Sequence, residues 1–144
     1  MNQERPILIV DDNEDDAFLV TRTLTAAGVV NPLVVLRDGE AAISYLDGTD
    51  KYSDRLVHPL PCLVLLDLKM PGKNGLEVLK WIRAHPALKK LRVIVITSST
   101  ELRNVNLAYQ FGADSFLVKP LELEDHKALL STIQAQQVVQ LRAG

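Results

Sequence analysis

The chain of 144 residues has the length of one domain, and an apolar content of 47% excludes a disordered tail. Its formal net charge of −2 gives no reason to expect a nucleic acid or an anionic membrane as partner. No apolar run is long enough to span a bilayer, no signal-peptide pattern is present, and a single cysteine, Cys62, excludes an intrachain disulfide. We expect one cytoplasmic domain, with its core over residues 5–135 and a helical extension or tail over 136–144.

The first half of the chain alternates apolar runs with helical patterns. Residues 7–10 form the first predicted strand, and a helical pattern then runs from Asn13 until Gly28 stops it. A strand over 32–37 precedes a helix over 39–46. The polar loop that follows, 47–60, is long for a connection of this kind.

The same alternation continues in the second half. Strands are predicted over 62–67, 92–97 and 115–118, and helices over about 75–84 and 101–111, with a last helix beginning near Glu122. Strands that alternate with helices indicate a parallel sheet covered on both faces. The sequence therefore predicts a doubly wound α/β fold.

Polar residues follow four of the predicted strands. They are Asp11-Asp12, Asp67, Thr97-Ser98 and Lys119-Pro120. In a doubly wound fold, binding sites form outside the carboxyl ends of the strands. We therefore expect these side chains to gather at one edge of the sheet.

The expected cluster has the composition of a phosphoryl-transfer site. Three adjacent carboxylates raise one another's pKa unless a cation is present, and Mg²⁺ prefers such oxygen ligands. Asp67 then has the character of a nucleophile that forms an aspartyl phosphate. Mg²⁺ would bind one phosphoryl oxygen, the Lys119 ammonium another, and the Thr97 hydroxyl with nearby backbone N–H groups the third.

Four motifs carry a resemblance to a known family. They are ILIVDD, LLDLKMPGKNG, VIVITSS and FLVKP, in this order over residues 7–120. Together they resemble the receiver domains of two-component response regulators. The resemblance implies a flavodoxin-like (βα)5 fold with a five-stranded parallel sheet in the order 2-1-3-4-5. It also implies Mg²⁺ as cofactor and a histidine kinase as phosphoryl donor.

The resemblance assigns roles to the acidic residues. Asp67 becomes the phospho-acceptor and a metal ligand, Asp12 a direct Mg²⁺ ligand, and Asp11 a ligand acting through water. The backbone carbonyl of Lys69 would complete the metal site. The expected chemistry is confined to the protein's own phosphotransfer and autodephosphorylation, so we do not expect an enzyme.

The resemblance also assigns a switch. Thr97 and Lys119 would hold the phosphoryl group, and the Thr97 hydroxyl would draw the Phe116 ring inward after phosphorylation. Many receivers carry a tyrosine at the position of Phe116, so a contact that needs its hydroxyl is lost here. The Lys119–Pro120 bond would be cis.

We expect signalling by protein contact, without an output domain and without DNA. The loop over 47–60 and the segment from Leu65 to Ser99 look similar to the small regulators of phytochrome-type kinases. The surface formed by the fourth helix, the fifth strand and the fifth helix would serve a partner or a second copy. The extension after residue 135 is expected to be either a homodimer contact or a frayed tail.

Three other functions fit the sequence less well. An aspartyl-phosphate phosphohydrolase would carry a second acid two residues beyond the nucleophile, where this chain has Lys69. An FMN-binding electron carrier needs a hydroxyl- and glycine-rich loop after the first strand, where DDNEDD would repel phosphate. A receiver-like adaptor that takes no phosphate stays open as an alternative; its best argument would be a missing member of the cluster, and none is missing. Residues Asn13 to Asp16 are interpreted as a solvated helix start favoured by the helix dipole, rather than as further metal ligands.

Overall fold

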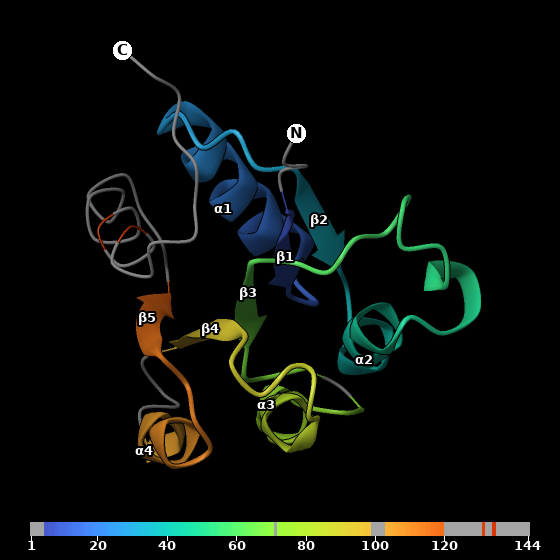
Figure 1. The fold of residues 1–144 in the computed structure, drawn as a ribbon. Coiled ribbons are helices and arrows are strands. Elements are labelled where there is room, and N and C mark those ends of the chain that lie inside the picture. The colour runs from blue at the N-terminus through green and yellow to red at the C-terminus, as the bar shows by residue number, and fades with distance from the viewer. Residues whose placement is uncertain (1–4, 71, 99–102, 120–130, 132–133, 135–144) are drawn as a thin grey trace.

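The sheet has five parallel strands in the order β2-β1-β3-β4-β5, as predicted (Figure 1). The computed structural model describes residues 5–70, 72–98, 103–119, 131 and 134. Runs rich in Ile, Val and Leu form the central strands, because both of their faces are covered. The strands are β1 Ile7–Val10, β2 Leu33–Leu36, β3 Leu63–Asp67, β4 Arg92–Ser98 and β5 Ser115–Lys119.

The described helices lie where the sequence predicts them, with ends that differ by up to two residues. They are α1 Glu14–Ala26, α2 Gly39–Asp47, α3 Gly75–Ala84 and α4 Arg103–Gln110. A short 3-10 helix, Asp50–Tyr52, lies inside the predicted loop over 47–60. Of the last predicted helix, which begins near Glu122, the structure describes Ser131 and Gln134, both helical; the extension over 136–144 lies outside the described residues.

Side chains of the strands alternate between two apolar cores, one on each face of the sheet. Ile7 and Ile9 of β1 pack in the core that contains the buried face of α1. Leu8 and Val10, the intervening residues, pack in the core that contains the buried residues of α2 and α3. Because successive strand residues point to opposite faces, continuous apolar runs supply both cores at once.

The helix that follows β3 is held unusually close to the end of that strand. Asn74 caps α3 and forms a reciprocal capping box with Glu77. The Gly75 amide donates to the Leu68 carbonyl at 3.0 Å. A Cβ at Gly75 would collide with the Asp67 carbonyl oxygen and the Leu68 backbone, so only glycine fits here. This contact fixes where Asp67 lies relative to α3.

The loop after α2 is anchored rather than loosely attached. The Arg55 guanidinium donates to the carbonyl oxygens of Tyr45 at 2.8 Å and Leu46 at 2.7 Å, at the carboxyl end of α2. The Tyr45 hydroxyl donates to the Pro59 carbonyl at 2.8 Å. These bonds satisfy helix-end carbonyls and give the polar segment a defined path.

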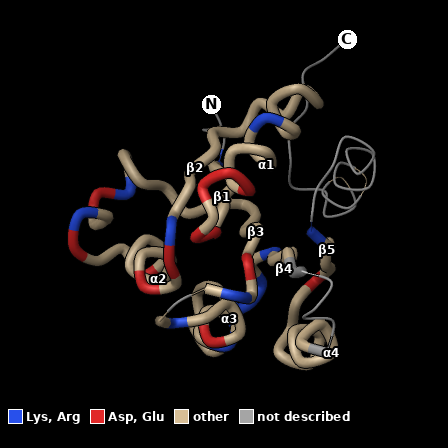
Figure 2. The backbone as a smooth tube through the Cα atoms, turned by 180° about the vertical axis from the view of Figure 1, so that it is seen from behind, with Lys and Arg blue, Asp and Glu red and all other residues tan. Residues whose placement is uncertain are grey.

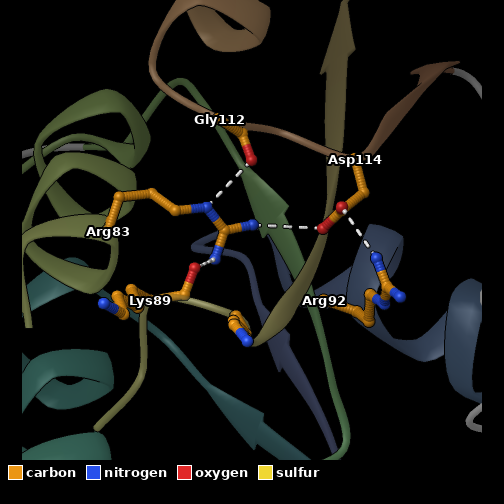
Figure 3. Close-up of a pocket in the computed structure, with 6 residues that line it drawn as sticks. Arg83, Lys89, Arg92, Gly112 and Asp114 are labelled. Atoms are coloured by element: carbon orange, nitrogen blue, oxygen red, sulfur yellow. Dashed lines mark hydrogen bonds and ion pairs between the residues drawn. The ribbon is translucent and has the colours of Figure 1, made fainter. Parts of the chain in front are cut away.

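A second arginine ties α3 to the β4 and β5 region (Figure 3). The Arg83 guanidinium donates to the carbonyl oxygens of Gly112 at 2.9 Å and Leu91 at 2.6 Å, and to Lys89 at 3.2 Å. Its remaining nitrogen pairs with the Asp114 carboxylate at 3.1 Å. The guanidinium therefore joins α3 to the segment just before β4 and to the turn before β5, 29 to 31 residues further along the chain. Within the described part of the chain, no helix is long and apolar enough to cross a membrane.

Candidate phosphoryl-transfer site

Two buried carboxylates lie side by side at the carboxyl ends of β1 and β3. The register of these strands pairs Val10 with Leu66, so the residues that follow, Asp11 and Asp67, are neighbours. Asp11 is 2% exposed and Asp67 4% exposed. Acidic segments gather at this end of β1, β3 and α1 in Figure 2. The strand ends thus bring together the residues that the sequence predicts to meet.

A third carboxylate completes a set of oxygen donors. Side-chain oxygens of Asp11, Asp12 and Asp67 all lie within 4.8 Å of one another. Asp12 is exposed, and no hydrogen bond or ion pair to another described residue engages its carboxylate. Two buried carboxylates and one facing solvent suit a hard divalent cation that keeps several waters.

Lys119, from the edge strand β5, reaches across to this cluster. Its ammonium nitrogen Nζ lies 2.9 Å from Asp11 Oδ2 and 3.2 Å from Asp67 Oδ2. The same nitrogen lies 2.9 Å from Asp16 Oδ2, on the first turn of α1. One ammonium therefore contacts carboxylates from three different elements.

The Asp67 carboxyl is strongly perturbed. Its Oδ2 accepts from Lys119, and its Oδ1 accepts from the Lys69 amide at 3.1 Å. Burial raises the pKa of Asp67 to about 7, against the lowering effect of the Lys119 charge and with a further rise from Asp11. Such an elevated pKa at a strand-end cluster is typical of functional carboxyls.

The Lys119 ammonium is held in its charged form. Burial alone would lower the pKa of this group, but hydrogen bonds to Asp16 and Asp11 outweigh burial and raise it. The ammonium therefore keeps its proton over the whole physiological range. It supplies a fixed positive charge beside Asp67.

The structure describes the other predicted site residues only in part. Thr97 lies at the carboxyl end of β4, paired with Val118, but its side chain is outside the described residues, as is Pro120. Phe116 is half-buried, and its ring meets that of Tyr109 edge-on at 5.9 Å. The roles assigned to Thr97, Phe116, Pro120 and the Lys69 carbonyl stay predictions.

The interpretation of Asn13 to Asp16 as a solvated helix start is wrong for Asp16. Asn13 caps α1 by accepting from the Asp16 amide, and the residues through Asp15 are exposed, as expected. The Asp16 carboxylate instead pairs with Lys119. The sequence contained one signal for this contact. Asp16 lies in the first turn of its helix, close to the end of the strand that precedes the helix.

A basic pocket of about 290 Å³ lies away from this cluster, at the amino-terminal ends of β4 and β5. It is lined by Arg83, Lys89, Lys90, Arg92, Gly112 and Asp114 (Figure 3). Each of the Arg83 nitrogens already donates to protein, and Asp114 also accepts from the Val93 amide at 2.8 Å. These bonds give Arg83 and Asp114 a structural role.

Comparison with known proteins identifies a single family over most of the chain. Residues 7–132 match the family described as "Response regulator receiver domain". Response regulator Rcp1 of Synechocystis sp. is 34% identical over 134 residues, which are 93% of this chain and 89% of that protein. The probable methanogenesis regulatory protein FilR2 of Methanothrix harundinacea is 37% identical over 128 residues, 89% of this chain and 80% of that protein.

Solved structures show the same likeness. The Mn²⁺-bound form of Rcp1 matches with a TM-score of 0.80 at 34% identity, covering 96% of this chain and 99% of that one. The bacteriophytochrome response regulator AtBRR matches with a TM-score of 0.82 at 35% identity, covering 99% of both chains. The phosphorylated cyanobacterial phytochrome response regulator RcpA matches with a TM-score of 0.81 at 28% identity, covering 98% of this chain and 100% of that one.

Proposed function

The chain belongs to the response regulator receiver domain family of two-component signalling, and on that premise we propose that it is a phosphorylation-activated switch. Asp67 accepts a phosphoryl group from the phosphohistidine of a histidine kinase. One observation carries this proposal above the others. The buried Asp67 carboxyl contacts the Lys119 ammonium and lies within 4.8 Å of two further carboxylates, at the edge of the sheet where sites of this fold form.

The transfer consists of one bond broken and one bond formed. A carboxylate oxygen of Asp67 attacks the phosphorus, and the N–P bond of the phosphohistidine breaks with its electron pair going to the imidazole. The imidazole takes a proton from water. The phosphoryl group is removed by hydrolysis. A water molecule attacks the phosphorus, inorganic phosphate leaves, and Asp67 returns to its carboxylate form.

The donor set fits Mg²⁺. The ligands available from the cluster are carboxylate oxygens, the type that hard divalent cations prefer. Asp11, Asp12, Asp67 and the Lys69 carbonyl would hold the ion. When bound, it supplies positive charge that relieves carboxylate repulsion and neutralises phosphoryl oxygen. The Mn²⁺ bound by the similar Rcp1 supports this assignment.

The chain's own groups bind and orient the phosphoryl group. The Lys69 amide fixes Asp67 Oδ1, which leaves Oδ2, on the side of Lys119, as the attacking atom. The Lys119 ammonium then donates to a phosphoryl oxygen without giving up its proton. Thr97, at the end of β4, supplies a hydroxyl to a second oxygen.

The output is a change of surface rather than a reaction on another molecule. The Thr97 hydroxyl moves towards the phosphoryl group and Phe116 follows it. Because the Phe116 ring meets Tyr109 of α4 edge-on, its movement repacks an exposed aromatic side chain. A downstream partner or a second copy reads this surface. The names of the similar AtBRR and RcpA support a phytochrome-type histidine kinase as donor.

Intact-mass analysis after incubation with acetyl phosphate tests the function. Wild type should gain one phosphoryl group only with Mg²⁺, and Asp67→Asn should gain none. Asp15→Asn, which removes a carboxylate from the exposed start of α1, serves as the matched control and should behave as wild type. A wild-type protein that binds Mg²⁺ but takes no phosphoryl group would instead support the adaptor function.

A further inference from the structure

The Lys119 ammonium has no hydrogen-bond donor to spare. An ammonium carries three N–H donors. Nζ lies 2.9 Å from Asp11, 2.9 Å from Asp16 and 3.2 Å from Asp67, so three carboxylates take all three donors. Before the bond between Asp67 and phosphorus forms, a phosphoryl oxygen can therefore bind Lys119 only if one of these carboxylates withdraws.

Asp16 is the carboxylate that leaves at the lowest cost. Asp11 and Asp67 have side chains that are 3% and 5% exposed, and each also accepts from a nearby backbone amide. The Asp16 side chain is 38% exposed. Water can therefore solvate the Asp16 carboxylate after it leaves Lys119, whereas a buried carboxylate would lose its partner without gaining water.

We propose that Asp16 competes with the incoming phosphoryl group for the Lys119 ammonium and thereby slows the phosphorylation of Asp67. The inference rests on the proposed function and adds a residue that tunes it. Asp16 is neither the phospho-acceptor nor a member of the metal-binding set. It acts through Lys119, as a positioning residue.

During phosphorylation, Lys119 exchanges one hydrogen-bond partner for another. When acetyl phosphate is the donor, its P–O bond breaks, acetate leaves with the electron pair, and the bond between Asp67 and phosphorus forms. Lys119 keeps its proton and exchanges the Asp16 carboxylate for a phosphoryl oxygen. Removing the Asp16 charge leaves only a neutral, weaker acceptor at this position and removes one source of repulsion towards the doubly negative phosphoryl group.

The test compares Asp16→Asn with Asp15→Asn in the full chain. Both variants remove one negative charge from the first turn of α1, but only Asp16 contacts Lys119. With acetyl phosphate and Mg²⁺, intact-mass time courses should show that Asp16→Asn accelerates phosphorylation roughly three- to fivefold, the scale of one partly exposed ion pair. Asp15→Asn should change the rate by less than about twofold, because its charge is exposed and screened.

A second readout separates competition from altered stability. Fluoroberyllate, a phosphoryl mimic that binds the acceptor carboxylate, should bind Asp16→Asn more tightly by a similar factor in the presence of Mg²⁺, measured by ¹⁹F NMR. A merely structural residue would leave this affinity unchanged while lowering the thermal midpoint.

The outcomes are distinct. If Asp16→Asn matches Asp15→Asn in rate and in fluoroberyllate affinity, competition is refuted while phosphorylation of Asp67 stands. A slower Asp16→Asn would also refute it, since Asp16 would then assist the transfer. Absence of any Mg²⁺-dependent mass gain in wild type would overturn both the inference and the proposed function.

Discussion

At the scale of single residues, burial and neighbouring charge decide how Asp67 behaves. The carboxyl is 4% exposed, and its pKa is raised to about 7. Asp11 lies beside it with its own carboxylate, while Lys119 opposes the effect. The ionised form of Asp67 is therefore unfavourable in this environment, and a bound cation would stabilise it.

Stability should consequently depend on pH through Asp67. A carboxyl whose pKa is higher in the folded protein binds its proton more tightly there than in the unfolded chain. Its stabilising contribution is complete below pH of about 4 and is lost as the pH rises to about 7. Asp67→Asn, which keeps a neutral side chain, should thus raise the free energy of unfolding by a few kcal/mol more at pH 8 than at pH 4.

Urea unfolding of both proteins in EDTA at the two pH values measures this difference. An equal effect of Asp67→Asn at pH 4 and pH 8 would contradict the raised pKa. Addition of Mg²⁺ at pH 8 should stabilise wild type more than Asp67→Asn, because the ion compensates the charge of the ligand that the variant lacks.

Asp12 offers a separate test of the metal site. It is exposed, so Asp12→Asn should fold normally, yet it removes the carboxylate that faces solvent in the three-residue donor set. We expect Mg²⁺ affinity to fall at least roughly tenfold, or about 1.4 kcal/mol. Isothermal titration calorimetry measures the affinity, and a change of similar size in Asp15→Asn would mean that general charge, not ligation, is responsible.

At the scale of elements, the junction between β3 and α3 positions Asp67, the proposed phosphoryl acceptor. Gly75→Ala would drive a Cβ into the Asp67 carbonyl oxygen and the Leu68 backbone, atoms that cannot rotate away. The expected cost is about 1–3 kcal/mol of unfolding free energy, with slower phosphorylation because the strand end shifts. Urea unfolding and intact-mass time courses measure the two effects.

Gly72→Ala is the control for this substitution. Gly72 has φ 71°, and a methyl group at its Cα would meet no atom of the described residues within 4 Å, so alanine there causes backbone strain but no collision. That strain is about 1–2 kcal/mol. Unchanged phosphorylation kinetics in Gly75→Ala would contradict a role for this close approach in placing Asp67.

The contacts of the Arg83 guanidinium predict that α3 loses stability when this side chain is replaced. Arg83→Met keeps the aliphatic stem but leaves the Leu91 and Gly112 carbonyls and the Asp114 carboxylate without this donor. We expect a loss of about 2–4 kcal/mol in unfolding free energy. Arg92→Met should cost less than about 1 kcal/mol, because the Arg92 side chain is half exposed and pairs with Asp114 at 3.4 Å. Similar losses in both variants would refute this role of Arg83.

At the scale of the whole molecule, the two faces of the sheet carry different exposed apolar residues. Leu107 and Tyr109 are exposed on α4, whereas Phe18 is exposed on α1, across the sheet. If phosphorylation creates a contact between copies at the α4 and β5 surface, Leu107→Lys should weaken it and Phe18→Lys should not. Sedimentation velocity before and after phosphorylation measures this, and equal loss in both variants would exclude that surface.

Much of the architecture follows from local pattern. A short, continuous apolar run such as the one in Leu63–Asp67 is typical of a strand covered on both faces, so its burial could be predicted from composition. Because all parallel strands end at the same edge, the meeting of Asp11, Asp12 and Asp67 was also predictable. The strand order came from the resemblance to receiver domains, since local pattern does not specify which strands are neighbours.

The sequence by itself determined the elements and the chemical types at the strand ends, because both depend on short-range periodicity and on residue identity. Only the tertiary structure decided that Asp16 joins Lys119 and that Arg83 closes onto Asp114. These contacts join residues far apart in the chain. Which partner a long, flexible side chain contacts depends on distances that the folded backbone sets. The raised pKa of Asp67 has the same origin, because burial and the positions of neighbouring charges exist only in the folded protein.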